Sequence, residues 1–280
     1  IRRIGLSSSL EHDNPGQWAR RMKELGCGAV VFPVDYTASE ELVNAYVQAA
    51  GEEGLVIAEV GAWCNPLAAD EQERQAAMER CVGQLKLADR IGAACCVNIT
   101  GSCGSRWDGA YPGNFTQEHW KKTVRSIKEI IDRAEPENTF YTVEPMPWMA
   151  PANPEEYAAL LAEVDRKHFG VHMDLANWIT SPEKYFGNEA FMETCFDRLG
   201  SYIKSCHIKD VCLQEEFTFQ LKEVACGEGI LNLEKYARLA EKVNPEMPMI
   251  IEHLHSDSEY LQSVAYLKER MEKAGLQVIN

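Results

Sequence analysis

The chain has 280 residues, of which 45% are hydrophobic and 25% are charged, and its formal net charge is −15 at pH 7. This composition is typical of a globular protein, and so acidic a surface would repel both nucleic acids and membranes rich in anionic lipids. No apolar run approaches the ~20 residues of a membrane span, and residues 1–9 lack the apolar stretch of a secretory signal, so we expect a cytoplasmic protein.

Short apolar runs alternate with amphipathic helical stretches along the whole chain. Strands are expected at 3–8, 29–34, 55–62, 95–101, 140–145, 170–175, 203–209 and 249–254. Helices are expected at 15–25, 39–53, 70–91, 115–134, 154–164, 188–199, 231–243 and 257–274. The strands are mostly continuous apolar runs, which is typical of strands buried on both faces of a parallel sheet.

Eight β-α units predict one (β/α)8 TIM barrel, an α/β fold, formed as a single catalytic domain by residues 1–280. An open, doubly wound sheet is the alternative. It would need a glycine-rich phosphate loop after an early strand, and the sequence has none.

The ten cysteines have no C-x-x-C spacing, and Cys95 and Cys96 lie side by side in an apolar run. In a chain without an export signal, such cysteines are expected to be free, buried thiols. We therefore expect neither disulfides nor a structural zinc site.

Four polar side chains lie at the ends of four consecutive strands, where TIM barrels carry their chemistry. They are Glu144, Asp174, His207 and Glu252. Three buried carboxylates need a compensating cation, and oxygen ligands with one imidazole suit a divalent metal. We expect one ion held by these four residues, with Mn²⁺ favoured and Mg²⁺, Co²⁺ or Zn²⁺ as alternatives.

Other polar and aromatic residues lie near the same strand ends. Substrate contacts are expected from His172, Glu59, Asn98, Trp107, Trp148, Asn177 and Lys209. Trp63 and Trp178 are further candidates for an aromatic wall around a sugar. His253 is expected to face away from Glu252 and to pack against a helix, because side chains alternate along a strand. Gly227-Glu228-Gly229 is a weak candidate for a phosphate loop, and its acidic residue argues against that function.

Several motifs together resemble the xylose isomerase-like barrel superfamily, which includes ketose 3-epimerases, hydroxypyruvate isomerase, inosose dehydratase and endonuclease IV. The motifs are Val143-Glu144-Pro145, His172-Met173-Asp174, 206–210, 227–229 and Ile251-Glu252-His253. In ketose epimerases of this group, the residues matching Glu144 and Glu252 bind metal and act as the acid/base pair. The residues matching Asp174 and His207 complete the site.

The resemblance implies a metal-dependent sugar isomerase or epimerase that removes a proton next to a carbonyl and passes through an enediolate. Epimerases of the group usually carry a second Glu after the first and an Arg beyond the His. Residues 147–149 and Lys209-Asp210 occupy those places here, which argues against a simple ketose 3-epimerase.

A second resemblance, over residues 177–186, is to the large subunits of bacterial C-glycoside-cleaving enzymes. It leaves a metal-dependent lyase as the alternative, either of that kind or acting by inosose-dehydratase-like β-elimination. A DNA-repair nuclease and a non-catalytic sugar-binding module are the other classes considered, and the net charge argues against the nuclease. The expected partner is a neutral sugar or glycoside. The alternatives for a protein partner are a second copy of the chain, in a homo-oligomer, or a small partner subunit for the lyase.

Overall fold

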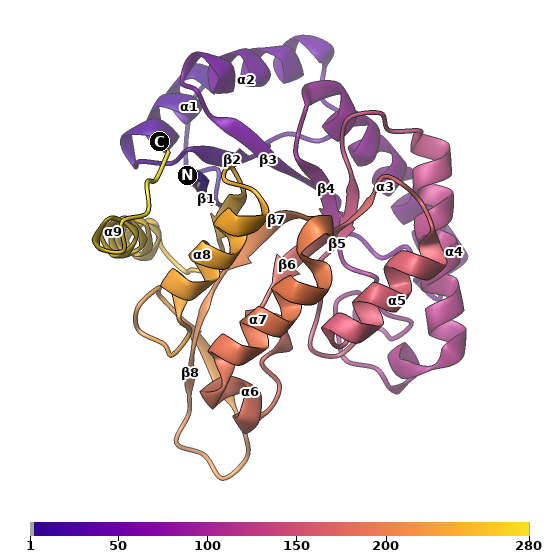
Figure 1. Cartoon of the computed structure of the whole chain (residues 1–280). Helices are drawn as coiled ribbons and strands as arrows, with labels where there is room; N and C mark the ends of the chain where they lie inside the picture. The colour runs from indigo at the N-terminus through magenta and orange to yellow at the C-terminus, as the bar shows by residue number, and fades with distance from the viewer. Residues whose placement is uncertain (1–2, 280) are drawn as a thin grey trace.

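The computed structural model describes residues 3–279. Its main sheet contains eight parallel strands in the order β1-β10-β7-β6-β5-β4-β3-β2 (Figure 1). The strands are β1 (Arg3–Leu6), β2 (Ala29–Val31), β3 (Val56–Gly61), β4 (Cys95–Asn98), β5 (Tyr141–Val143), β6 (Phe169–Asp174), β7 (Ile203–Ile208) and β10 (Pro248–Ile251). All eight expected strands are present, each somewhat shorter than or shifted from its predicted range.

The two ends of the sheet meet at β1 and β2. The amide of Gly28 donates a hydrogen bond of 2.9 Å to the carbonyl of Ile4. The approach is close at Gly5, where a Cβ atom would lie 2.4 Å from the carbonyl oxygen of Ala29. The sheet is therefore a nearly closed barrel, and the predicted TIM-barrel fold is confirmed.

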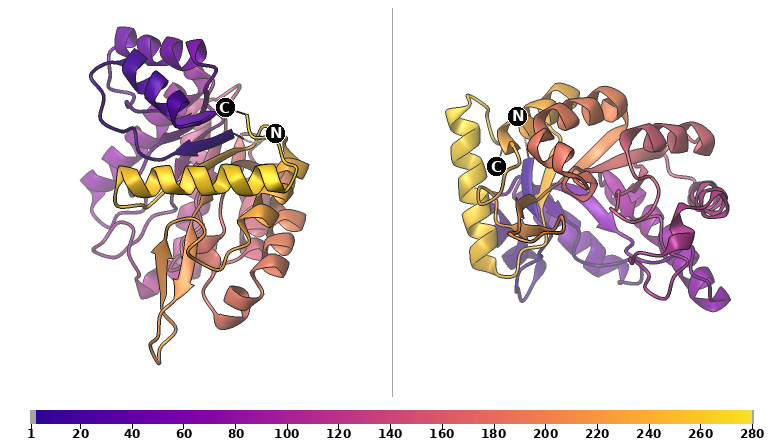
Figure 2. Two further views of the ribbon diagram at one scale, coloured as in Figure 1. Left: turned by 90° about the vertical axis from the view of Figure 1, so that its left-hand side faces the viewer. Right: turned by 90° about the horizontal axis from the view of Figure 1, so that it is seen from below.

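Helices follow the strands and cover the outside of the barrel (Figures 1 and 2). The long ones are α1 (Pro15–Glu24), α2 (Glu40–Glu52), α3 (Glu71–Ile91), α4 (Gln117–Ala134), α5 (Pro154–Val164), α7 (Asn188–Leu199), α8 (Leu233–Val243) and α9 (Asp257–Lys273). Local sequence explains where they begin. Asn14 and Asn153, each followed by proline, accept hydrogen bonds from the amides of Gln17 and Glu156. Within residues 3–279, no helix is long and apolar enough to cross a membrane.

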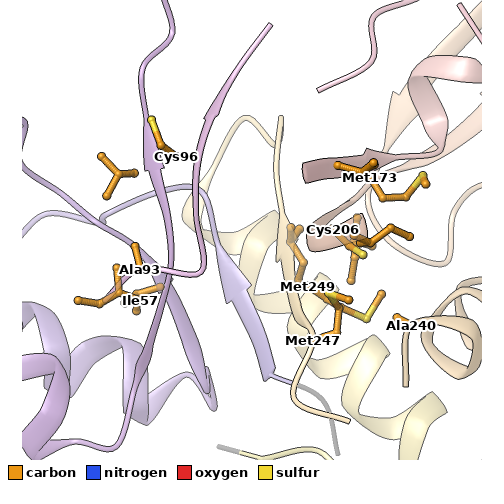
Figure 3. Packing of buried hydrophobic residues seen from close by; sticks show 14 of the residues in the cluster. Ile57, Ala93, Cys96, Met173, Cys206, Ala240, Met247 and Met249 are labelled. Carbon is orange, nitrogen blue, oxygen red and sulfur yellow. The ribbon is translucent and has the colours of Figure 1, made fainter. Parts of the chain in front are cut away.

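Apolar side chains from the strands and helices form one large buried cluster. Figure 3 shows Cys206 among Met173, Met247 and Met249 in this cluster. All ten cysteines are free, and seven of them are buried, as the sequence predicts. The core therefore holds its thiols as small apolar side chains.

The sequence does not predict four short elements, namely η1 (Pro112–Phe115), η2 (Ala176–Trp178), α6 (Pro182–Phe186) and η3 (Gly200–Tyr202). It also does not predict the antiparallel hairpin of β8 (Asp210–Leu213) and β9 (Leu221–Val224), which begins directly after Lys209. Figures 1 and 2 show this hairpin projecting beyond the barrel.

The base of the hairpin is fixed by the buried carboxylate of Asp210. Its Oδ2 accepts hydrogen bonds from the amides of Gly227 and Gly229 at 2.9 and 3.0 Å. Its Oδ1 accepts from the amides of Val211 and Leu231 at 2.9 and 3.0 Å. A Cβ atom on Gly229 would lie 2.1 Å from Oδ1, so the glycine is needed for this approach. The motif Gly227-Glu228-Gly229 thus binds a carboxylate of the chain itself.

Candidate metal centre

Four neighbouring strands bring Glu144, Asp174, His207 and Glu252 together. Glu144 directly follows β5, Asp174 ends β6, His207 lies in β7 and Glu252 directly follows β10. One ligand atom from each residue lies within 4.8 Å of the others. All four residues are buried, the most exposed being Glu252 at 6%. We call this set the ligand cluster.

Three atoms of the ligand cluster are buried without a hydrogen-bond partner among the described residues. They are Oδ2 of Asp174, Nδ1 of His207 and Oε1 of Glu252. When Nδ1 of His207 carries no proton, each of the three atoms has a lone pair, and together with a carboxylate oxygen of Glu144 they form the oxygen-rich donor set that a divalent cation prefers. The residues present therefore fit a bound metal ion.

Lys209 places a cation beside the ligand cluster. Its Nζ lies 2.6 Å from Oδ2 of Asp174 and 2.7 Å from Oε1 of Glu252. It lies 3.7 Å from Oε1 of Glu144 and donates a hydrogen bond of 3.2 Å to Oδ1 of Asn177. The Lys209 side chain is only 1% exposed, and its charge partly offsets the three carboxylates.

The ligand cluster is nevertheless short of positive charge. Burial, reinforced by Glu144 and Glu252, raises the pKa of Asp174 to about 8 despite the attraction of Lys209. Burial acts against the protonated form of His207, yet the surrounding carboxylates raise its pKa well above the ordinary value. The raised pKa values of Asp174 and His207 mean that the site binds protons more readily than usual. For the same reason it favours binding of a metal ion.

Glu59 lies behind His207, on the side of the imidazole away from the ligand cluster. Its Oε2 is 3.3 Å from Nε2 of His207, and its Oε1 is 2.8 Å from Nε2 of His172. Ser205 also donates a hydrogen bond to Oε1. Glu59 and His172 are both fully enclosed, so they support His207 from the barrel interior. Their predicted contact with substrate stays a prediction.

Asn177, a predicted substrate residue, forms a hydrogen bond with Glu144. Its Nδ2 donates hydrogen bonds of 2.9 Å to Oε1 of Glu144 and 3.0 Å to the carbonyl of Pro145. Asn98, by contrast, is fully buried. Its Oδ1 accepts from the amide of Cys64, and its Nδ2 donates to Sγ of Cys81. Asn98 therefore fixes the chain after β3.

The four tryptophans considered as an aromatic wall occupy different positions. Trp63 is 39% exposed and stacks on the His207 ring at 6.4 Å between centroids. Trp148 is half-buried, and its indole NH donates to the carbonyl of Asp108. Trp107 is also half-buried, in the loop after β4. Trp178 is fully buried and donates to the carbonyl of Pro151, so its expected place in the wall is wrong.

Two more residues near the ligand cluster are not correctly predicted from the sequence. Nδ1 of His253 lies 3.0 Å from Oε2 of Glu223, which belongs to β9. The expectation that His253 packs against a helix is wrong, because its side chain is 54% exposed and its backbone has a φ of 60°. β10 ends at Ile251, so the alternation of side chains no longer applies. Nothing in the sequence indicates Glu223, because its hairpin is not predicted.

Comparison with known proteins agrees with the fold. Residues 18–270 match the model of the family described as xylose isomerase-like TIM barrel. The chain belongs to this family. No curated protein matches the chain.

Solved structures with the same fold belong to proteins whose names give different functions. D-psicose 3-epimerase from Clostridium cellulolyticum, with D-tagatose, has a TM-score of 0.73 at 13% identity, over 98% of this chain and 100% of that one. Endonuclease IV from Thermus thermophilus has a TM-score of 0.73 at 14% identity, over 97% and 99%. A xylose isomerase-like protein from Mycobacterium smegmatis, in complex with magnesium, has a TM-score of 0.68 at 16% identity, over 92% and 88%. At these identities the similarity shows the fold alone.

Proposed function

We propose that the protein is a divalent-metal-dependent sugar isomerase or epimerase that removes a proton next to a substrate carbonyl. The observation that carries this proposal is the convergence of three buried ligand atoms that form no hydrogen bond, from Asp174, His207 and Glu252, at the ends of adjacent strands. The epimerases among the structural neighbours support the reaction class, and the magnesium-bound neighbour supports the cofactor.

A divalent cation at this site would act as a Lewis acid towards the negative charge that develops on the substrate oxygen. The proton itself would be taken by the chain. Glu252 is suited to this task because its second oxygen, Oε2, lies beside an exposed side chain, with Nε2 of His253 at 3.6 Å, and so lies on the open side of the site. Burial alone would raise the pKa of Glu252, but His207 and Lys209 lower it well below its ordinary value. In the metal-free site Glu252 is therefore ionised at neutral pH, which is the form that can accept a proton.

Glu144 is the second proposed acid/base residue. Its Oε1 accepts a hydrogen bond from Asn177, which fixes the orientation of the carboxylate. Its Oε2 lies 3.5 Å from Nδ1 of His207. Glu144 and Glu252 thus approach the ligand cluster from different strands, β5 and β10, and would contact a substrate from different sides.

Proton exchange with the solvent tests the proposal. The protein loaded with Mn²⁺ is incubated in D₂O with neutral ketoses and with glycosides oxidised to ketones, and loss of the proton next to the carbonyl is followed by NMR. We expect exchange that stops on chelation. In Glu252→Gln, exchange should fall by about 100-fold or more while the metal content is retained. Glu215→Gln, an exposed change in the hairpin, is the matched control.

The metal assignment is tested separately. His207→Ala should sharply lower the metal content by elemental analysis, with the fold preserved by circular dichroism. Full metal content in this variant would exclude His207 as a ligand. Undiminished exchange in metal-loaded Glu252→Gln would exclude Glu252 as the base. Product analysis in the same assay separates an isomerase or epimerase from the lyase alternative, which would release a substituent. No contact among residues 3–279 specifically favours the lyase.

A further inference from the structure

Lys209 occupies an unusual position for a lysine. It lies two residues beyond His207, and its Nζ contacts Oδ2 of Asp174 and Oε1 of Glu252 at 2.6 and 2.7 Å. These are two of the three ligand atoms that form no hydrogen bond. The ammonium is therefore located against the same oxygens that a metal ion would use.

An ammonium and a divalent cation would compete for these two oxygens. A metal ion takes carboxylate oxygens at about 2.0–2.6 Å and presents its own positive charge to any neighbouring cation. At the spacing of these contacts, two cations in a buried site repel each other strongly, because little water screens them. Binding of a metal to Asp174 and Glu252 thus requires the Lys209 ammonium to move away.

Two polar groups outside the ligand cluster are available to receive it. Oδ1 of Asn177 already accepts a hydrogen bond from Nζ at 3.2 Å. Oε1 of Glu223, on β9 of the hairpin, forms an ion pair with Nζ at 4.0 Å. The Glu223 side chain is 41% exposed, so this exchange of partners would move the ammonium towards the open side of the site.

We propose that Lys209 is the counter-cation of the metal-free ligand cluster, and that it competes with the metal ion for Asp174 and Glu252. The inference rests on the proposed function in one respect, namely that the cluster takes a divalent metal. Lys209 keeps the three carboxylates together when no metal is present, and it weakens metal binding because its ammonium must be displaced. On metal binding it exchanges these contacts for Asn177 and Glu223.

The experiment compares Mn²⁺ binding to the metal-free protein and its variants by titration calorimetry. Lys209→Met removes the charge and keeps an unbranched apolar side chain. Lys222→Met is the matched control, because it makes the same change of net charge at an exposed position of β9. We expect Lys209→Met to bind Mn²⁺ at least tenfold more tightly than both the wild type and the control. Equal or weaker binding by Lys209→Met would overturn the proposal.

Thermal unfolding gives a second readout on the same proteins. Metal-free Lys209→Met should melt at a lower temperature than the wild type, because its carboxylates have lost their cation. Added Mn²⁺ should raise its melting temperature by more than it raises that of the wild type. A metal-free variant as stable as the wild type would contradict the role of Lys209 as counter-cation.

The wild type provides a test that does not depend on the folding of Lys209→Met. The Nζ resonance of Lys209 is observed by NMR in protein with isotopically labelled lysine and assigned by its loss in Lys209→Arg. Addition of Mg²⁺, which is diamagnetic, should shift this resonance and speed its hydrogen exchange. An unchanged resonance in metal-loaded protein would overturn the proposal.

The two proposals fail in different ways. If the wild type binds no divalent metal while Lys209→Met does, the competition is supported and a metal-dependent function of the native protein is excluded. If the wild type binds Mn²⁺ and catalyses proton exchange, but Lys209→Met binds no more tightly, the proposed function stands and the competition is excluded.

Discussion

Nε2 of His207 lies 3.3 Å from Oε2 of Glu59, on the opposite side of the ring from the Nδ1 atom that faces Glu252. A carboxylate behind a histidine ligand fixes the proton on the distant nitrogen and leaves the near nitrogen free to bind a cation. Because Glu59 itself is buried and held by Ser205 and His172, the orientation of the imidazole is determined before any ligand arrives.

Glu59→Gln should therefore lower metal affinity by about 10- to 100-fold, because the amide no longer provides a charged acceptor for His207. The measurement is a Mn²⁺ titration of the metal-free variant, with circular dichroism to check the fold. Glu52→Gln is the control, since it makes the same chemical change at an exposed position of α2, away from the imidazole. Unchanged affinity in Glu59→Gln would show that metal binding by His207 does not depend on the contact of its Nε2 with the Glu59 carboxylate.

The raised pKa of Asp174, about 8, predicts how metal binding depends on pH. Below this value the carboxyl carries a proton that a metal ion must displace, so affinity should rise as the pH rises towards about 8. Without metal the sign is the reverse. The folded pKa lies above the ordinary value, so this group's contribution to stability is greatest at acidic pH and is lost as the pH rises through about 8.

Titration calorimetry at several pH values, in buffers of different ionisation enthalpy, would measure the protons released when Mn²⁺ binds. Asp174→Asn provides the control, because it removes this proton. A wild-type affinity that does not change between about pH 6 and pH 8 would contradict the prediction.

Substrate charge is predicted by the cations near the ligand cluster. Among the described residues, Lys209 is occupied by carboxylates, and Arg106 pairs with Asp108 at 2.8 Å in an exposed loop. A phosphorylated sugar would meet a negative site without the charge-assisted donors that normally bind its dianion. Neutral ketoses or oxidised glycosides should therefore have at least a tenfold higher kcat/KM than sugar phosphates. A tenfold preference for the phosphorylated substrate, equivalent to about 1.4 kcal/mol, would show the opposite.

Asp210 should matter for stability, because its carboxylate accepts four backbone hydrogen bonds at the base of the hairpin. In Asp210→Asn an NH₂ group replaces one acceptor oxygen and faces two of these amides. The free energy of unfolding should fall by about 2–4 kcal/mol, at the usual value of hydrogen bonds to a charged group. Urea denaturation measures this loss. Glu228→Gln, an exposed change in the same loop, should leave stability nearly unchanged.

The barrel and the ligand cluster could be predicted from sequence because both depend on local patterns. Continuous apolar runs mark strands that are buried on both faces. Charged residues such as Glu144 and Asp174 stand at the ends of these runs. Because all the strands are parallel, their ends meet at one face of the barrel, and the charged residues there come close together. The four ligand residues therefore meet in the structure as the strand ends predict.

Other features depend on partners that are distant in sequence. The contact of Glu59 with His207 spans 148 residues, and no periodicity relates the two. The hairpin is not predicted because its strands are short and β9 is mostly exposed, so no apolar run marks it. His253 is misplaced because β10 ends at Ile251, before the end of the strand range that the sequence suggests.

The hairpin after β7 is fixed at its base and free at its tip. Asp210 is the first residue of the hairpin, and its carboxylate binds the amide of Gly227 in the returning chain. The connection at 214–220, by contrast, carries the fully exposed Phe217. Insertions or substitutions in this connection would leave the ligand cluster in place, because the four residues of the cluster lie on the barrel strands and not in the hairpin. The tip of the hairpin should therefore tolerate changes of length and sequence during evolution, or in directed evolution. The four residues of the ligand cluster would be inherited unchanged.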